Sequence, residues 1–422
     1  MDILNKIFSL SGMTVVIFGA FLIAAVGYAL GRITIKGVSL GTAGVFLVAL
    51  LFGYLFTLTG LTDIPVLKNF FIENAAAANV KYYKMLESLG LVLFVTSVGF
   101  IAGPSFFRNL KKNAKSYVLL GVLIVGSGAL ICALFSLIPG IGSPFGTGIL
   151  SGALTSTPGF SAAKSAVAES AEGLVSLGHA VAYPFGVVGV VLFVQLIPKF
   201  LKANMEEERI KMKKGIEAPV VQEETGKKLL SLDEYGLGTF GITMVLGIIF
   251  GSITIPLSSA GFDGAKFSLG NTGGPLIIAL IIGHFGKIGR LSLKVHDKTL
   301  KVFREFGLML FLIGAGVEGG VELVSQVQAS QYGAMLLLYG FLGGVVMTTI
   351  PMFVGFFFAK KVLKISLFNN LGSITGGMTS TPALGTLIGV SGTDDVASAY
   401  AATYPVALVL IVLASQLIAV LI

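Results

Sequence analysis

Charge, cysteine and histidine are scarce in this sequence. Of its 422 residues 12% are charged, one is cysteine, three are histidine and none is tryptophan, whereas soluble proteins carry about 25% charged residues. The single Cys132 lies inside an apolar run, which excludes a disulfide framework, and no Cys/His cluster exists for a structural metal. The sequence also lacks a catalytic triad, a metalloprotease motif and a P-loop, so we expect no enzyme and no bound cofactor.

Hydrophobic residues, in contrast, make up 55% of the chain. Apolar runs of about 20 residues recur along its whole length, and one such run is enough for a helix to cross a hydrocarbon core of about 30 Å. We therefore predict an all-α polytopic membrane protein whose surroundings are the lipid bilayer.

Four sequence blocks of the first half recur in the same order in the second half. The pairs are "SLGTAG" with "SLGNTG", "LGLVLFVTSVGFIAG" with "FGLMLFLIGAGVEGG", "TSTP" at 155–158 with "TSTP" at 379–382, and "AYPFGVVGVVLFVQLI" with "TYPVALVLIVLASQLI". Four matches in one order predict an internal duplication.

Each half is predicted to hold five membrane-spanning helices and one interrupted segment. The helices are placed near 13–30, 38–58, 86–103, 117–138 and 176–199 in the first half, and near 236–257, 268–286, 303–318, 333–358 and 398–421 in the second. The interrupted segments, near 143–170 and 366–390, are rich in Gly, Ser, Thr and Pro, as expected of re-entrant hairpins. The predicted domains are a first permease repeat over 1–200, a linker over 201–234 that could hold a short helix, and a second permease repeat over 235–422.

Positive charges predict the orientation of the chain. If the N-terminus is outside, most of the 29 Lys and Arg residues fall in cytoplasmic loops, as the positive-inside rule requires. We therefore attribute the positive net charge to orientation and expect no nucleic-acid partner. Five spans per half is an odd number, so the two halves enter the membrane from opposite sides. This predicts an inverted repeat with both termini outside and a cytoplasmic linker, a plan typical of secondary transporters.

The two TSTP segments are the strongest candidates for a substrate site. In each, the threonine before the proline is expected to be the N-cap of a helix that has proline at its first position. A helix that begins inside the membrane offers free N–H groups and about half a positive charge to an anion. The substrate-binding residues predicted here are Thr155, Ser156, Thr157, Pro158, Thr379, Ser380, Thr381 and Pro382. The glycines expected to let the hairpin arms pack closely are Gly148, Gly152, Gly372, Gly376 and Gly377.

Two "YP" dipeptides lie in the fifth and tenth predicted helices and are expected to interrupt them. Tyr183 and Tyr404 each precede a proline, which cannot donate to the carbonyl four residues earlier. The carbonyls of Ala180 and Ala401 are thereby freed for a substrate ammonium group or for a coupling cation, Na⁺ or H⁺. A structural kink is the alternative role.

Other polar side chains in apolar segments also have two roles open to them. Lys164 lies two helical turns after Thr157, where it would neutralise the second carboxylate of a dicarboxylate or extend to the membrane surface. Gln195 and Gln416 either join neighbouring helices by hydrogen bonds or contact the substrate. Glu318 is either a hydrated helix end or a proton or cation site.

The doubled "GALTSTPGF" and "GGMTSTPALG", together with the paired "YP" helices, resemble the aspartate:alanine exchanger family over nearly the whole chain outside the linker. More distantly, "GSITGGMTSTPALG" is similar to a hairpin of sodium/glutamate symporters. The resemblance implies an elevator-type homodimer of the bacterial cytoplasmic (inner) membrane that exchanges amino acids or related carboxylates. Family members typically carry paired TrkA C-terminal-type domains where this chain has only the linker, so regulation by those domains is not expected here and aspartate/alanine specificity is not implied.

The leading hypothesis is a secondary active transporter of a small anionic or zwitterionic solute, such as aspartate, alanine or a dicarboxylate, that works as an antiporter. The alternative is a sodium- or proton-coupled symporter or exporter of the same solutes, because the sequence shows no unmistakable ion site. A passive channel, or a membrane sensor that binds a partner through 201–234, is a hypothesis from a different class.

Overall fold

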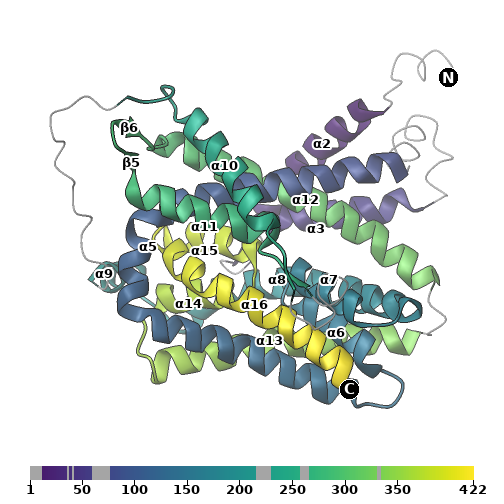
Figure 1. Ribbon diagram of the computed structural model, residues 1–422. Coiled ribbons are helices and arrows are strands. Elements are labelled where there is room, and N and C mark those ends of the chain that lie inside the picture. The colour runs from purple at the N-terminus through teal and green to yellow at the C-terminus, as the bar shows by residue number, and fades with distance from the viewer. Residues whose placement is uncertain are drawn as a thin grey trace, which may run out of the picture. The chain divides into compact units, whose positions relative to one another are not determined.

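The computed structural model describes residues 12–35, 38–39, 42–58, 77–214, 230–256, 266–329 and 334–422 (Figure 1). Its helices are α2 (Met13–Gly31), α3 (Ala43–Phe56), α5 (Ala77–Ser136), α6 (Gly142–Ala153), α7 (Thr157–Ala166), α8 (Glu172–Phe200), α9 (Met205–Lys214), α10 (Leu237–Ser252), α11 (Gly270–Phe285), α12 (Asp297–Ala329), α13 (Ala334–Lys361), α14 (Leu367–Gly377), α15 (Thr381–Ser391) and α16 (Val396–Leu421), with a 3-10 turn at Glu169–Ala171. The prediction of an all-α chain is confirmed.

Strands are short and form antiparallel ribbons of two. The pairs are β1 (Thr34–Ile35) with β2 (Val38–Ser39), β3 (Ile255–Pro256) with β4 (Lys266–Phe267), and β5 (Lys287–Ile288) with β6 (Leu291–Ser292). The first ribbon connects α2 to α3 and the second connects α10 to α11. The two halves of the chain therefore use the same kind of connection at equivalent places.

Six helical stretches of the described chain are long and apolar enough to cross a membrane: Met13–Gly31, Val80–Pro104, Lys115–Ser136, Glu172–Phe200, Met335–Lys361 and Val396–Leu421. Apolar side chains remain on their outer faces, as Leu130 and Leu134 do with 62% and 60% exposure, which is typical of a lipid-facing surface. The sequence predicts ten spans. Of the others, α3, α10 and α11 have only 14 to 16 residues, and α12 carries charged residues on both sides of its apolar centre.

Two of the predicted helices, at 86–103 and 117–138, belong to one continuous helix, α5, without the loop that we expected between them. The intervening residues 105–114, "SFFRNLKKNA", contain neither glycine nor proline. Lys, Arg, Leu and Ala are good helix formers, so polarity alone does not end the helix there. The apolar parts on either side of this segment still coincide with the two predicted spans.

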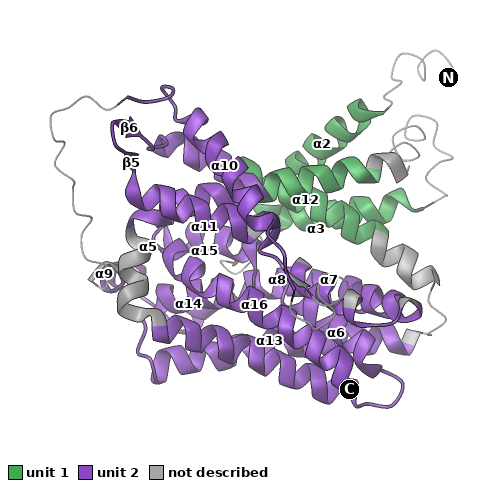
Figure 2. Cartoon of the chain, in the orientation of Figure 1, with its two compact units in different colours: residues 1–91, 306–333 green, residues 92–305, 334–422 purple. Residues whose placement is uncertain are grey.

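The chain forms two compact units, drawn in different colours in Figure 2. Unit 1 comprises residues 1–91 and 306–333, and unit 2 comprises residues 92–305 and 334–422. Each unit contains residues from both halves of the sequence, so the units differ from the repeats. Within unit 1, a Cβ atom on Gly27 of α2 would lie 2.5 Å from Cα of Val45, and one on Gly316 of α12 would lie 2.5 Å from Cβ of Ala49. Helix α3 therefore packs on α2 and α12 through small residues, as membrane helices commonly do.

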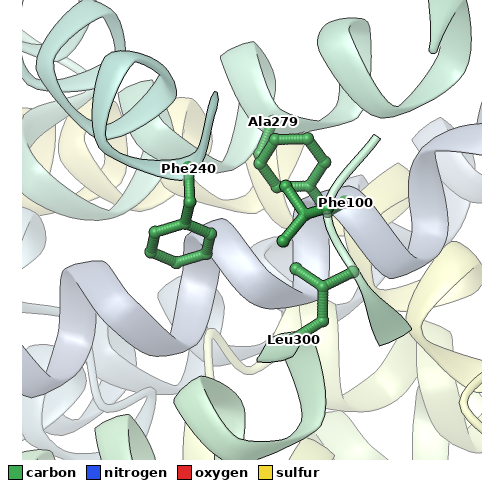
Figure 3. Close-up of a cluster of buried hydrophobic side chains, with 5 residues drawn as sticks. Phe100, Phe240, Ala279 and Leu300 are labelled. Atoms are coloured by element: carbon green, nitrogen blue, oxygen red, sulfur yellow. The ribbon is translucent and has the colours of Figure 1, made fainter. Parts of the chain in front are cut away.

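A cluster of buried side chains joins α5, α10, α11 and α12 within unit 2 (Figure 3). The ring of Phe240 is stacked 6.1 Å from that of Phe100 and lies 4.8 Å from that of Phe303. Ala279 and Leu300 complete the contact. Aromatic pairs at such distances add attraction to close packing, so the cluster holds together the parts of these four helices that belong to unit 2.

Unit 2 also includes two helical hairpins and the long helices that support them. Hairpin 1 is the pair α6–α7, and hairpin 2 is the pair α14–α15. Helix α6 packs on α8, and α14 packs on α16. In addition, α7 packs on α16 and α15 on α8, so each hairpin also contacts the long helix from the other half of the sequence.

Candidate functional site

The two TSTP segments form the tips of the hairpins. Thr155 and Thr379 have φ values of 50° and 49°, in the left-handed region. Each tip is a Schellman motif: the Ser156 N–H donates to the Ser151 carbonyl at 2.8 Å, and the Ser380 N–H donates to the Thr375 carbonyl at 2.9 Å. Glycine is the usual residue at the left-handed position of this motif, and a β-branched residue there costs roughly 1–2 kcal/mol. Both hairpins therefore hold a strained threonine at the same place.

Hydrogen bonds between the two tips stabilise the left-handed conformation of these threonines. The Thr155 hydroxyl donates to the carbonyl of Met378 at 3.2 Å, and the Thr379 hydroxyl donates to the carbonyl of Leu154. Each threonine thus binds the residue that precedes the other. Leu154 and Met378 are the C-caps of α6 and α14, so these bonds also satisfy helix-end carbonyls that lack a partner in their own helix.

Helices α7 and α15 begin directly after the tips, one residue earlier than predicted. The N-caps are Ser156 and Ser380, not Thr157 and Thr381, and Pro158 and Pro382 occupy the second helical position. The reason is the Schellman motif, which already brings the serine into the extended conformation of a cap. The side chain of Thr157 lies outside the described residues.

The two cap serines differ in their hydrogen bonds. The Ser156 hydroxyl accepts a bond from the Gly159 N–H at 3.1 Å. The Ser380 hydroxyl is fully buried and, within the described chain, makes no hydrogen bond. Next to it, the Thr381 hydroxyl lies 3.5 Å from the Tyr400 hydroxyl, and both side chains are buried. A buried hydroxyl without a partner is costly. The Ser380 hydroxyl at the start of α15 is therefore available to donate a hydrogen bond to an acceptor atom of a ligand.

Glycines set the approach of each hairpin to its long helix. A Cβ atom on Gly152 would lie 2.6 Å from the His179 carbonyl oxygen, and one on Gly376 would lie 2.5 Å from the Tyr400 carbonyl oxygen. Gly148 and Gly372 face α8 and α16 in the same way, whereas Gly377 faces Ile124 of α5. These glycines let the hairpin arms pack closely, as expected, and the partner of each arm is a helix outside the hairpin. The reason is that the i, i+4 spacing places them on one side of α6 or α14.

Aromatic side chains lie beside both tips. The His179 ring is stacked between Phe160 and Tyr183, at 4.4 and 5.2 Å, and its Nδ1 lies 2.9 Å from the Ser151 hydroxyl. In the second half, Tyr400 and Tyr404 stack at 5.1 Å. The sequence does not reveal that His179 contacts Ser151 on hairpin 1.

The prolines of the "YP" dipeptides do not interrupt their helices. Pro184 lies inside α8 and Pro405 inside α16, and both helices continue on either side. Packing of α8 and α16 against the hairpins holds them in helical conformation, since tertiary contacts override the local cost of proline. Proline still cannot donate to the carbonyls of Ala180 and Ala401, both of which belong to buried residues.

The remaining predicted side chains have these surroundings. Lys164 Nζ lies 3.4 Å from a carboxylate oxygen of Glu172 and 5.5 Å from the centre of the Phe160 ring, so its charge has a partner that the sequence did not indicate. Gln195 and Gln416 are buried. In unit 1, Glu318 accepts a hydrogen bond from Lys84 at 2.7 Å.

The described residues contain no group of three or more His, Cys, Asp or Glu side chains that could hold a metal ion. The polar groups gathered at the tips are instead hydroxyls, helix N–H groups and carbonyls. Such groups bind carboxylates, ammonium groups or alkali cations.

Comparison with known proteins finds matches along nearly the whole chain. A family model described as "Predicted Permease Membrane Region" matches residues 19–199 and 239–420. An uncharacterized transporter of Bacteroides fragilis is 27% identical, with 95% of this chain and 97% of the relative covered. Another of Desulfotalea psychrophila is 25% identical, with 99% and 97% covered. The first alignment runs over 554 positions, against 422 residues here, so that relative contains segments that this chain lacks.

Proposed function

Because the chain belongs to the aspartate:alanine exchanger family of membrane transporters, we propose that it transports a small carboxylate-bearing solute by exchange and binds this solute at the hairpin tips. Aspartate, alanine and dicarboxylates are the first candidates, as amino-acid antiport would require. The chain is a multi-pass membrane protein. We place it in the bacterial inner membrane with both termini outside and the linker 201–234 cytoplasmic.

One observation carries the proposal. Two helices, α7 and α15, begin at tips that are hydrogen-bonded to each other, so their N-terminal ends are held at one place in unit 2. The positive ends of helix dipoles and the free N–H groups of a first turn attract an anion. Within a membrane protein, such ends are tolerated where they line a binding site.

The exchange of hydrogen bonds between Thr155 and Thr379 also supports an inverted repeat with re-entrant hairpins. When two copies of a unit are related by a two-fold axis, residue i of one contacts residue j of the other and the reverse contact is also made. The tips do this, and α7 and α15 exchange their supporting helices likewise. We propose that a homodimer moves this site by an elevator mechanism of alternating access.

The residues around the tips take separate roles in this proposal. Ser380 and Thr381 donate hydroxyl hydrogen bonds to the substrate carboxylate at the N-terminus of α15. The pair Tyr183 and Tyr404 lies beside the tips and shapes the site. The carbonyls of Ala180 and Ala401 accept from a substrate ammonium group or hold a coupling cation. We assign Gln195 and Gln416 to contacts between helices, since both are buried.

Counterflow into proteoliposomes tests the proposed function. Vesicles loaded with unlabelled aspartate, alanine or a dicarboxylate are diluted into labelled aspartate, with and without a sodium gradient. An exchanger accumulates label only when a countersubstrate is inside, and it does so without sodium. Uptake into empty vesicles that follows a sodium or proton gradient would assign the chain to the coupled symporters. Flux that does not saturate would indicate a channel, and no flux with any carboxylate would contradict the proposal.

A further inference from the structure

Helix α9, in the segment between the two repeats, has a start that is specified by its own sequence. The Asn204 side-chain oxygen accepts hydrogen bonds from the N–H groups of Glu206 and Glu207, and the Asn204 amide donates to the Glu207 carboxylate. This is a reciprocal cap. Three successive glutamates in the first turn also stabilise the helix, because their negative charges lie at the positive end of its dipole. The prediction of a short helix in this segment is confirmed, and the helix does not depend on the hairpins for its start.

Two neighbouring side chains of α9 reach the two ends of hairpin 2 that lie away from its tip. Glu208 accepts a hydrogen bond from the N–H of Leu367, the first residue of α14, at 3.2 Å. Arg209 donates from Nε to the carbonyl of Ser391, the last residue of α15. A carboxylate at a helix N-terminus and a guanidinium at a helix C-terminus are the charges that each helix dipole favours. One turn of α9 therefore holds both outer ends of the same hairpin.

Hairpin 2 has no side-chain cap of its own at the start of α14, and α15 ends at a glycine whose N–H donates to the Ile388 carbonyl. Ser366, at the N-cap position of α14, makes no capping bond, and its buried hydroxyl is without a partner among the described residues. Gly392 ends α15 with a φ of 66°, and a Cβ atom on it would lie 2.7 Å from Nη2 of Arg209. The guanidinium thus occupies the space beside a glycine whose conformation other residues rarely adopt. Helix α9 also packs on α14, and its Met212 is fully buried.

From these contacts we propose that α9 positions hairpin 2, with Glu208 and Arg209 as the positioning residues. Helix α15 has 11 residues, about 16 Å at 1.5 Å per residue, so its outer end and the Ser380 end belong to one rigid rod. Fixing the outer end fixes the N-terminus that receives the carboxylate. That last consequence rests on the proposed function, whereas the hold on the hairpin does not.

Amide hydrogen exchange of the substrate-free protein in nanodiscs tests the hold directly. Glu208→Ala and Arg209→Ala are compared with Glu206→Ala, which removes a charge from the same helix at an exposed side chain. Lys211 is not a suitable control, because its Nζ donates to the Glu208 carboxylate at 2.7 Å. Alanine preserves the helix. Losing a helix cap should speed the exchange of amides in 367–391 about fivefold, while the control exchanges as the wild type does. Equal rates in all three variants would overturn the proposal.

A conservative variant separates positioning from general stability. Gln at position 208 retains an oxygen that accepts from Leu367, so Glu208→Gln should keep hairpin exchange close to the wild-type rate while Glu208→Ala does not. Exchange that rises equally throughout unit 2 in Glu208→Ala would show a loss of stability only, and would overturn positioning. This comparison remains decisive if Arg209→Ala does not fold.

Transport kinetics test the link to the substrate site. In counterflow with aspartate, Glu208→Ala should raise the apparent KM severalfold and change kcat less. The variant displaces the N-terminus of α15 in the empty site, which weakens binding, whereas the step that follows binding is unaffected. Faster hairpin exchange with an unchanged KM would overturn this link. If the wild type transports no carboxylate, the proposed function fails, and the exchange experiment still decides the role of α9.

Discussion

The hydroxyl of Thr155 donates to the carbonyl of Met378 at 3.2 Å, across 223 residues of sequence. The bond joins the tip of hairpin 1 to the tip of hairpin 2. In the opposite direction, the Thr379 hydroxyl donates to the Leu154 carbonyl. Both threonines have a left-handed backbone that glycine would adopt more easily. A strained residue persists only where its surroundings over-determine it, and here the surroundings are the opposite hairpin.

Substitutions of Thr379 should separate the strain from the bond. Thr379→Ala loses the hydroxyl and keeps the strain, whereas Thr379→Gly loses both. We therefore expect the alanine variant to be less stable than the glycine variant by about 1 kcal/mol, measured by thermal unfolding in detergent. Thr386→Ala is the control, because that hydroxyl donates to the Pro382 carbonyl within its own helix, α15. Equal stability of the alanine and glycine variants would contradict the argument from strain.

The two cap serines should respond differently to removal of the hydroxyl. Ser156→Ala removes a cap and should lower stability by about 1 kcal/mol. Ser380→Ala removes a buried hydroxyl that has no partner among the described residues, so stability should be unchanged or rise. Substrate affinity in Ser380→Ala should instead fall by about 0.5–2 kcal/mol, as for a lost cap, and Thr381→Ala should behave likewise. The Tm of the ligand-free protein measures stability, and the shift in Tm with added ligand measures affinity. Wild-type affinity in Ser380→Ala and Thr381→Ala would remove the anion site from α15.

Close packing of hairpin 1 on α8 predicts intolerance to a single methyl group. In Gly152→Ala the new Cβ atom would lie 2.6 Å from the His179 carbonyl oxygen, and backbone cannot yield as a side chain does. Overpacking of this kind costs about 1–3 kcal/mol. Gly389→Ala, on the exposed side of α15 with nothing within 4 Å of the new atom, should raise stability by up to about 1 kcal/mol. Thermal unfolding of the two variants provides the comparison.

The pairing of Lys164 with Glu172 predicts a small effect of its removal. Both side chains are partly exposed, and such ion pairs contribute about 0–1 kcal/mol. Lys164→Met should therefore leave stability and the ratio of dicarboxylate to monocarboxylate transport close to wild type. Competition of succinate and acetate against labelled substrate measures that ratio. A selective loss of dicarboxylate transport would instead identify Lys164 as the counter-charge of a second carboxylate.

The start of α10 predicts a dependence of stability on acid. Asp233 accepts hydrogen bonds from the N–H groups of Leu237 and Gly238, at 2.8 and 2.6 Å, and these bonds hold its pKa below the ordinary 3.8. A folded-state pKa below the unfolded one means that the carboxylate contributes stability above pH 3.8, which is lost as the pH falls from there through the lower folded value. Asp233→Asn should show a weaker fall in Tm over that window. An identical acid profile in both proteins would contradict the capping role.

Local chemistry made some parts of this protein predictable. The Pro-Gly-Ser-Thr composition of the interrupted segments correctly separated two hairpins from the surrounding spans, and the repeat of TSTP correctly placed them as equivalents. The N-caps were displaced by one residue because the Schellman motif at each tip depends on a left-handed threonine, which propensity disfavours. The prediction of a loop near 105–114 was wrong, because polar residues without glycine or proline do not end a helix.

Sequence by itself determined the membrane class, the duplication and the family, since these depend on composition, apolar length and residue order. Only the tertiary structure decided which polar groups meet. It brings Thr155 to Met378, and Glu208 and Arg209 to hairpin 2, although these groups are distant in sequence. It also pairs Lys164 with Glu172 and leaves the Ser380 hydroxyl without a hydrogen-bond partner among the described residues. Hydrogen bonds are short and directional, so a sequence can supply their donors and acceptors, but only packing brings them within reach.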